Sequence, residues 1–520
     1  MLRKKLKAKD YLLSILSAFL LILSFPDLNL WFCAWFAFVP VFFALNNKTA
    51  KEAFLLFFIT GSVFWAGTIY WLVHVTFAGT LALIFYLSLY FAFFGALIRP
   101  VTRRSNLQSL IFIPCLWVLL EYIRGFFLTG FPWALLGYSQ YQNLPVIQVA
   151  DICGAWGVSF LIVFVNAAIV EMVWAAKNGF WPRLKTTAVL LSTVLVLVLG
   201  YGYYKLYHRP CLSLPVRQAG GRQASTIDHR PFKISVIQGN IPQEIKWHAD
   251  SQEMIIDKYF LLTKEASGQD PDLIVWPEAA LPSVLEEEPV FYEKALALAE
   301  QIRIPLLLGS ATLRGSVYYN SALLVSKEGR AQGRYDKLHL VPFGEYIPLR
   351  GSLPFLETVV PIGDFAAGSE YTVFPITATR YPLSAKFSVL ICFEDLFPQL
   401  SRRFRMRGAD FLINITNDAW FKKTSSPNQH LSASVFRAVE NRVNLVRSAN
   451  TGVSAFIDPK GRIASLLRND KGETIFVDGF LTQDIYVSGA PLSLYTRYGD
   501  FFVLFCLIFL IIYFILKKRR

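Results

Sequence analysis

The residue best placed for chemistry is Cys392, which follows an apolar run at the end of a predicted strand. Residues 387–391 read FSVLI, and after Cys392 come a phenylalanine, a Glu-Asp pair and, a little later, a proline. An apolar run broken in this way predicts a buried strand whose end opens into a loop. A thiol there is accessible on a rigid backbone, which suits a nucleophile, although a lone cysteine more often packs as a small hydrophobic side chain.

Two other stretches supply the groups that a nucleophilic thiol needs. Residues 273–276 form a short apolar run that leads to Glu278, and Lys337 shares a segment rich in proline and glycine with Glu345. Alone, Glu278 would be a surface carboxylate and Lys337 a solvated loop lysine. Together with Cys392 they are the parts of an activated-thiol site. The carboxylate takes the thiol proton, the thiolate attacks a carbonyl, and the ammonium stabilises the developing oxyanion.

Six motifs in a fixed order resemble one protein family. They are GFPWALLGYSQ at 130–140, IPQEIKW at 241–247, WPE at 276–278, YDKLHLVPFGEYIP at 335–348, CFED at 392–395 and NITNDAWF at 414–421. The set resembles the nitrilase (carbon–nitrogen hydrolase) superfamily with its Glu-Lys-Cys triad, and in particular the apolipoprotein N-acyltransferase family, in which this domain is set among membrane helices. The resemblance implies Glu278 as base, Lys337 as oxyanion stabiliser and Cys392 as nucleophile, in an α-β-β-α sandwich.

The resemblance also implies supporting residues around this triad. Glu345 would hold Lys337 or share the role of the base. Glu394 would orient the loop after the nucleophile, as Asp395 could, and Trp247 would shape the acyl or lipid pocket.

The sequence departs from the family directly after the nucleophile, where Phe393 stands in place of the usual tyrosine. We therefore assign no role to that side chain and expect at most a contribution of its backbone N–H to an oxyanion hole. Asn417 and Asp418 are expected to support the sheet edge.

A Cys-His hydrolase is the local alternative, because His339 and His430 lie in the same half of the chain. In the family motif His339 is not the base, so Glu278 is favoured. The sequence has no Cys-x-x-Cys pair, histidine cluster or Gly-rich phosphate loop, so we expect neither a metal nor a cofactor. Whether Cys153 pairs with Cys211 stays open.

The composition indicates a membrane protein with a separate polar domain. Of the 520 residues, 54% are hydrophobic and 17% are charged, whereas a soluble domain usually carries about 25% charged residues. The deficit is concentrated in residues 1–205. Apolar segments predict eight membrane spans, roughly at 11–26, 29–46, 52–74, 78–98, 107–124, 155–176, 186–205 and 500–516.

Basic residues alternate between the loops that join these spans. The two termini and the second, fourth and sixth loops are basic, the first and third loops have no Lys or Arg, and the fifth has Arg124. By the positive-inside rule, both termini are cytoplasmic and the long segment after the seventh span is on the outer side. In a diderm bacterium that side is the periplasm. The formal net charge of +14 therefore reflects membrane topology, and we expect no nucleic-acid partner.

Four regions are expected along the chain: a membrane domain at 1–205, a linker or insertion at 206–231, a periplasmic catalytic domain at 232–490, and a final span with a basic tail at 491–520. In the third region, helical patterns alternate with strand patterns, which predicts a mixed sheet with helices outside it. The predicted helices are at 251–266, 288–302 and 430–442.

The fifth loop, about 125–154, is long and rich in aromatic residues, among them Phe131, Trp133 and Tyr138. These side chains form either an interfacial aromatic belt or one wall of a lipid-entry groove, and the two interpretations are compatible.

The resemblance implies a multi-pass acyltransferase of the bacterial inner membrane. It would move a fatty-acyl chain from a phospholipid to the N-terminal amine of a diacylglyceryl-apolipoprotein, through a thioester on Cys392, and we expect it to act as a monomer. A membrane-tethered amidase would share the triad, but a small soluble substrate needs neither eight spans nor the aromatic loop. A transporter with an inactive outer domain would carry several charges at mid-membrane, and the sequence shows few.

Overall fold

The computed structural model describes residues 6–102, 107–207, 231–347, 365–487 and 491–518. The chain divides into two compact units. The helical unit comprises Met1–His208, Thr424–Phe436 and Tyr498–Arg520, and the α/β unit comprises Arg209–Lys423 and Arg437–Arg497. Nearly all of the predicted linker at 206–231 lies outside the described residues, and so does Cys211. The linker, its boundaries and the pairing of Cys211 therefore stay predictions.

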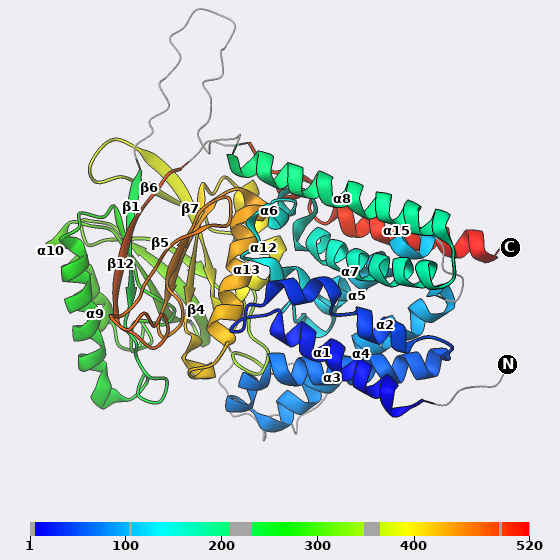
Figure 1. Ribbon diagram of the computed structural model, residues 1–520. Helices are drawn as coiled ribbons and strands as arrows, with labels where there is room; N and C mark the ends of the chain where they lie inside the picture. Colours follow the sequence, from blue (N-terminus) through cyan, green and yellow to red (C-terminus); the bar gives the residue numbers. More distant parts are fainter. Residues whose placement is uncertain (1–5, 103–106, 208–230, 348–364, 488–490, 519–520) are drawn as a thin grey trace, which may run out of the picture. The chain divides into compact units, whose positions relative to one another are not determined.

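The helical unit is built from apolar helices (Figure 1). In it, α3 packs along α1 and α4, and α5 packs against α7 and α15. The helices are α1 (Ala8–Leu23), α2 (Val39–Ala44), α3 (Ala50–Thr68), α4 (Phe77–Thr102), α5 (Leu107–Arg124), α6 (Leu144–Ile147), α7 (Ala150–Lys177), α8 (Trp181–Tyr207) and α15 (Phe501–Lys518).

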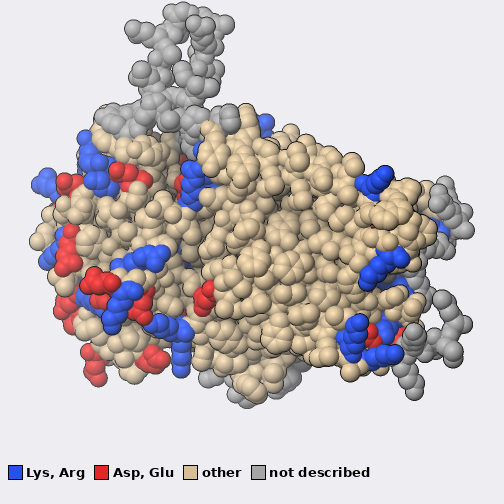
Figure 2. Space-filling view, in the orientation of Figure 1, with Lys and Arg blue, Asp and Glu red and all other residues tan. Residues whose placement is uncertain are grey.

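Four helices of the described chain are long and apolar enough to cross a membrane: Ala50–Thr68, Phe77–Arg99, Ala150–Lys177 and Trp181–Tyr207. Figure 2 shows one face of this unit almost free of charge, with Lys and Arg gathered at one end. Such a surface suits hydrocarbon, where a charged side chain is costly. The number of spans beyond these four stays a prediction.

The segment expected as one span at 29–46 is two short helices, Trp31–Phe36 and α2. Asn166 in α7 explains the break, because its amide replaces helical hydrogen bonds on both sides of it. Its Oδ1 accepts the Phe38 N–H at 2.8 Å, and its Nδ2 donates to the Ala34 carbonyl at 2.9 Å. Since these main-chain groups are satisfied from another helix, the chain can turn here inside an apolar unit.

The α/β unit contains two six-stranded mixed sheets, with the orders β12-β1-β2-β3-β4-β5 and β11-β10-β9-β8-β7-β6. In each sheet the central three strands, β1-β2-β3 and β7-β8-β9, are parallel, and the flanking strands are antiparallel. The strands are β1 (Phe232–Gln238), β2 (Leu273–Val275), β3 (Leu306–Arg314), β4 (Val317–Val325), β5 (Ala331–Asp336), β6 (Phe374–Thr377), β7 (Ser384–Ile391), β8 (Phe411–Thr416), β9 (Asn444–Ala449), β10 (Ala455–Ile457), β11 (Ile463–Leu466) and β12 (Gly479–Ile485).

The two sheets pack face to face, with β1 against β9 and β4 against β7. The outer face of the first sheet is covered by α9 (Gln252–Ser267) and α10 (Val290–Ile302), whose apolar faces share one core with it (Figure 1). On the second sheet, α12 (Pro398–Met406) lies against β7. The remaining α-helices of the described residues are α13 (Ser426–Asn441) and α14 (Leu494–Tyr498). The predicted fold class, a helical membrane domain with an α-β-β-α sandwich, is confirmed.

Candidate active site

Cys392 lies directly after β7, at the first residue of a 3₁₀ turn, Cys392–Leu396. Its φ of 52° is in the left-handed region, which a residue other than glycine enters at a cost and which concentrates at functional sites. The Nδ2 of Asn414 in β8 donates to the Cys392 carbonyl at 3.1 Å and fixes this turn. The cysteine remains partly accessible. A sharp turn after a buried parallel strand therefore presents the thiol, as the sequence predicts.

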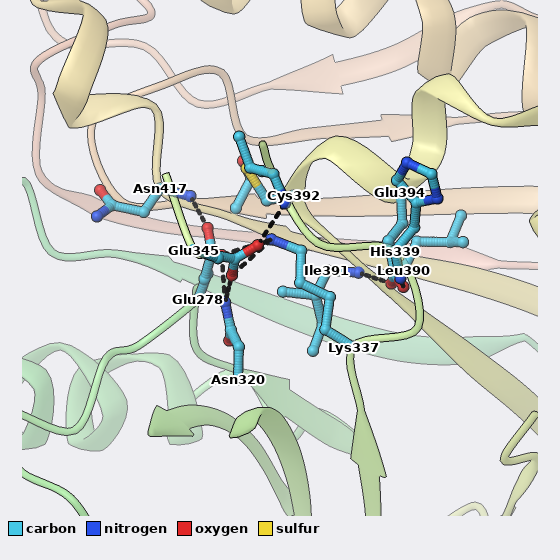
Figure 3. Close-up of polar contacts among 12 residues, drawn as sticks. Glu278, Asn320, Lys337, His339, Glu345, Leu390, Ile391, Cys392, Glu394 and Asn417 are labelled. Atoms are coloured by element: carbon cyan, nitrogen blue, oxygen red, sulfur yellow. Dashed lines mark hydrogen bonds and ion pairs between the residues drawn. The ribbon is translucent and has the colours of Figure 1, made fainter. Parts of the chain in front are cut away.

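Glu278 follows β2, and both of its carboxylate oxygens are held. Asn320 Nδ2 in β4 donates to Oε1 at 2.8 Å, and the main-chain N–H of Asn417, directly after β8, donates to Oε2 at 2.8 Å (Figure 3). Lys337 Nζ lies 3.5 Å from Oε1. Since only 7% of the residue is exposed, these contacts replace water around the carboxylate.

Lys337 follows β5 directly and is almost fully buried, with 1% exposed. Its Nζ contacts both oxygens of Glu345, at 3.0 and 2.9 Å. Asn320 Nδ2 also donates to Glu345 Oε1 at 2.8 Å, and the N–H of Val341 donates to its Oε2 at 2.8 Å. One ammonium thus lies between two carboxylates that share the amide of Asn320, as Figure 3 shows.

The surroundings of Cys392 keep its thiol protonated at rest. Burial raises the pKa of the Cys392 thiol well above its usual value, and Glu278 adds to this, while Lys337 acts in the opposite direction. Burial alone would lower the pKa of Lys337, but the carboxylates of Glu345 and Glu278 raise it above its usual value. The site therefore combines a protonated thiol, a carboxylate that can take its proton and a permanent cation.

Glu394 joins the turn that begins at Cys392 to the segment that follows Lys337. Its carboxylate accepts main-chain N–H groups of Ile391 at 2.7 Å, Leu338 at 2.7 Å and His339 at 3.1 Å, and the Tyr335 hydroxyl donates to both of its oxygens at 2.8 Å. Burial raises the pKa of Glu394 to about 7, although the main-chain donors oppose this.

Comparison with known proteins places these residues in a family. Residues 17–168 match the family described as "Apolipoprotein N-acyltransferase N-terminal domain", and residues 233–479 match "Carbon-nitrogen hydrolase". Apolipoprotein N-acyltransferase of Geobacter metallireducens is 40% identical over 96% of this chain and 93% of its own length. The enzyme so named in Pasteurella multocida is 30% identical over 89% of this chain and 88% of its own length. The chain belongs to the apolipoprotein N-acyltransferase family.

Among solved structures, an amidase from Nesterenkonia sp. is similar to this apolipoprotein N-acyltransferase family member with a TM-score of 0.39 and 19% identity. The match covers 54% of this chain and 97% of the amidase. A carbon-nitrogen hydrolase from Helicobacter pylori has a TM-score of 0.38 and 18% identity, over 50% of this chain and 90% of its own.

Within this family member, the structure gathers five of the residues singled out from the sequence: Glu278, Lys337, Glu345, Cys392 and Glu394 (Figure 3). Their roles in the reaction stay predictions, because geometry alone does not test them.

Four further residues were expected to bind substrate. Trp247 is in the α/β unit and 45% exposed. Phe131, Trp133 and Tyr138 belong to the helical unit, where Trp133 and Tyr138 are buried. The rings of Phe131 and Trp133 stack with centroids 6.5 Å apart. Packing accounts for these three residues, and lipid binding by them stays a prediction.

Three contributors to the site were missed or placed differently. Asn320 gave no signal, since an asparagine in a strand pattern is not diagnostic. Asn417 was expected only to support a sheet edge, but its main-chain N–H contacts Glu278. Lys246 was passed over within IPQEIKW, although it is buried and its Nζ donates to the Glu278 carbonyl at 3.1 Å. The position of this charged residue inside a family motif was the signal that could have identified Lys246.

The histidines and aspartates considered from the sequence make packing contacts or ion pairs outside the cluster of Glu278, Lys337 and Glu345. The His339 ring packs at a tilt against the Phe397 ring, with centroids 3.7 Å apart, and His430 belongs to the helical unit. Asp395 and Asp418 both pair with the buried Arg447, at 3.2 and 3.1 Å. Within the described residues, no group of His, Cys, Asp and Glu side chains could hold a metal ion.

Proposed function

We propose that this chain transfers a fatty-acyl chain from a membrane phospholipid to the α-amino group of a diacylglyceryl-cysteine at the N-terminus of an apolipoprotein, by a ping-pong route. The observation that carries the proposal is the arrangement of Glu278, Lys337 and Cys392 at three strand ends. This arrangement is built to form and discharge an acyl-cysteine. Its place in a chain with apolar membrane helices makes lipids the natural substrates.

In the first step, Glu278 takes the proton of Cys392 as Sγ attacks an ester carbonyl of the phospholipid. The Sγ–C bond forms, and the carbonyl oxygen becomes an oxyanion that Lys337 stabilises. The C–O bond of the ester then breaks, and Glu278 returns the proton to the departing alkoxide, which leaves as a lysophospholipid. The acyl chain remains on Cys392 as a thioester.

In the second step, the free amine of the apolipoprotein attacks the thioester carbonyl, and Lys337 stabilises the second oxyanion. The C–S bond breaks, Glu278 accepts a proton from the amine nitrogen, and that proton returns to the thiolate. A thioester reacts with amines more readily than an oxygen ester does, so the covalent detour helps amide formation. It also lets two bulky lipids use one site in turn.

The half-reaction tests this mechanism. Incubated with phospholipid and no acceptor, the enzyme should gain one acyl mass on Cys392 and release lysophospholipid, and neutral hydroxylamine should remove the acyl group. Cys392→Ala should gain no mass. Glu278→Ala should load far more slowly, because its thiol has lost its base. Lys337→Ala should lose on the order of a hundredfold or more, because the oxyanion is unstabilised.

The acceptor distinguishes transfer from hydrolysis. A lipopeptide with a free N-terminal diacylglyceryl-cysteine should discharge the loaded enzyme, and an N-acetylated lipopeptide should not. Loading of Cys392→Ala, or equal discharge by the acetylated peptide, would show the covalent N-acyl transfer to be wrong.

The proposed setting is the bacterial inner membrane, with both termini in the cytoplasm and the α/β unit in the periplasm, acting as a monomer. The alternation of basic loops supports this orientation. On the periplasmic side the site would meet exported apolipoproteins together with membrane phospholipids.

A further inference from the structure

Lys246 lies in the segment between β1 and α9, and hydrogen bonds fix this segment to residues that follow other strands. The N–H of Ile241 donates to Asn450 Oδ1 at 2.9 Å, and Asn450 Nδ2 donates back to the Ile241 carbonyl at 2.8 Å. Gln243 Oε1 accepts from Asn417 Nδ2 at 2.9 Å. Lys246 is 2% exposed. The segment thus carries a lysine into the interior on a fixed main chain, and a lysine is rarely buried unless it is paired.

The side chain of Lys246 ends on the residue proposed as the base. Its Nζ donates to the main-chain carbonyl of Glu278 at 3.1 Å. The same stretch of main chain also lies on Gly309 in β3, where an added Cβ would be 2.5 Å from the Pro277 carbonyl oxygen and 2.8 Å from the Glu278 Cα. Lys246, through its hydrogen bond, and Gly309, which has no side chain, together fix the main chain of Glu278. From there the carboxylate reaches the other site residues.

Lys246 also changes the charge balance of the site. Glu278 and Glu345 provide two carboxylates, and Lys337 alone provides one ammonium. With Lys246 as a second ammonium, the charges balance before the reaction. When the thiol proton moves to Glu278, the negative charge moves to Sγ and then to the oxyanion. An ammonium that interacts with Cys392 as well as with Glu278 lowers the free energy of the thiolate and of the oxyanion, and it does so more in a buried site than it would in water.

We propose that Lys246 is a positioning residue of the acyl transfer, which holds the main chain of Glu278 and, as an ammonium, supplies the second positive charge that favours the Cys392 thiolate. This inference rests on the function proposed above, because it assigns Lys246 to the same reaction. The proposal does not require Lys246 to contact the substrate.

The protonation of Lys246 provides a readout. Burial lowers its pKa to about 8, although Glu278 and Cys392 act in the opposite direction. These two are the titratable groups that face it, from the ends of β2 and β7, and Lys337 and Glu345 complete the cluster around Glu278. Lys246 is therefore an ammonium below about pH 8 and neutral above it, so its charge effect should be lost as the pH rises.

The experiment compares wild type with Lys246→Met, which keeps length and removes charge, across pH 6.5 to 9.5. Two rates are measured: alkylation of Cys392 by iodoacetamide without lipid, and acylation of Cys392 by phospholipid. The ratio of wild-type to variant rate should be about ten at pH 7 and approach one above pH 9, with a midpoint near 8. Taking the ratio cancels the titration of groups that both proteins share.

Lys246→Gln separates charge from hydrogen bonding, because it keeps a donor without the charge. It should show the same pH-dependent deficit as Lys246→Met. A Gln variant that restores the wild-type rate at pH 7 would reduce Lys246 to a structural hydrogen bond and overturn the proposal. A ratio near one at every pH would overturn it as well. Lys264→Met, on the exposed face of α9, is the matched control and should behave as wild type.

The two readouts keep this inference distinct from the proposed function. A pH-dependent alkylation ratio in an enzyme that phospholipid does not load would support the electrostatic role of Lys246 while refuting acyl transfer. Normal loading with an unchanged ratio would refute Lys246 alone. If both variants fail to unfold cooperatively in detergent, the wild-type acylation profile decides: a fall centred near pH 8 supports the role, and its absence overturns it.

Discussion

Asn320 is the residue that lets two carboxylates lie beside one lysine. Its single amide nitrogen donates to Glu278 and to Glu345, at 2.8 Å each. We predict that Asn320→Asp lowers the rate of Cys392 acylation on the order of a hundredfold, because it removes this donor and adds a third carboxylate against the other two. Single-turnover loading with phospholipid measures the effect, and thermal unfolding in detergent controls for misfolding. Loading within threefold of wild type would mean that the shared amide is dispensable.

Phe393 marks the departure of this chain from the family pattern. Its ring packs against Phe397 with centroids 5.1 Å apart and lies 6.1 Å from the ring of His339. We predict that Phe393→Tyr keeps acylation within a few-fold of wild type, since Glu278, Lys337 and Cys392 are positioned without this hydroxyl. A change of about a hundredfold in either direction would correspond to roughly 2.7 kcal/mol in the transition state. It would show that the side chain takes part in the reaction.

The approach of β3 to the turn after β2 decides where Glu278, the proposed base, lies. Gly309 leaves no room for a side chain, because an added Cβ would meet main-chain atoms of Pro277, Glu278 and Ala279 at 2.5 to 2.8 Å. We predict that Gly309→Ala shifts Glu278 and slows acylation at least tenfold while the protein still folds. Gly268→Ala is the control, since its Cβ would meet only the Glu265 carbonyl, at 3.3 Å. Equal loading by the two variants would contradict the prediction.

Glu394 couples β7 to the segment after β5, and its titration should appear in stability. In the folded chain, the pKa of the Glu394 carboxyl is raised from 4.5 to about 7. Between these two pH values the folded chain therefore keeps a proton on Glu394 that the unfolded chain has released. The free energy of unfolding should therefore fall as the pH rises from about 4.5 to 7, and then level off. We predict that Glu394→Gln removes this part of the pH dependence. Thermal unfolding of both proteins in detergent at pH 5 and 7.5 measures it, and parallel curves would contradict it.

The sequence predicted those elements whose pattern is strong. The buried strands β2 and β7 and the amphipathic helices α9 and α10 follow from apolar runs and helical spacing. Three elements were not predicted: β5 (AQGRYD), β12 (GFLTQDI) and α12 (PQLSRRFRM). Their sequences are polar, and their structure depends on the elements that they pack against. The pairing of the sheets and the hydrogen bonds of Asn320 and Asn417 join distant residues, so no local pattern contains them.

The central prediction for the whole molecule is its orientation in the membrane, with the α/β unit on the periplasmic side. If the positive-inside rule holds, alkaline phosphatase fused after Phe232 should be active and a fusion after Lys185 inactive, because this enzyme matures only in the periplasm. The measurement is phosphatase activity normalised to the amount of fusion protein. The reverse pattern would place the α/β unit in the cytoplasm and remove the proposed access to exported apolipoproteins.

The division into two units differs from the division expected along the sequence. Residues 424–436 lie within the predicted catalytic domain, yet their contacts group them with the helical unit. The buried Gln429 accounts for this: its Oε1 accepts from Trp133 Nε1 at 2.7 Å, and its Nε2 donates to the Thr68 carbonyl at 2.9 Å. Helical spacing predicts α13 but cannot say which neighbours its glutamine meets.

The left-handed conformation of Cys392 has a consequence for how this protein can change over evolutionary time. A cysteine at φ 52° holds conformational strain of about 1 kcal/mol or more that glycine would release. Stability alone would therefore favour a substitution that removes the proposed nucleophile. A copy of the gene freed from selection for activity could gain thermal stability at this codon while losing its chemistry, so robustness of the fold and retention of the thiol are opposing pressures at one position.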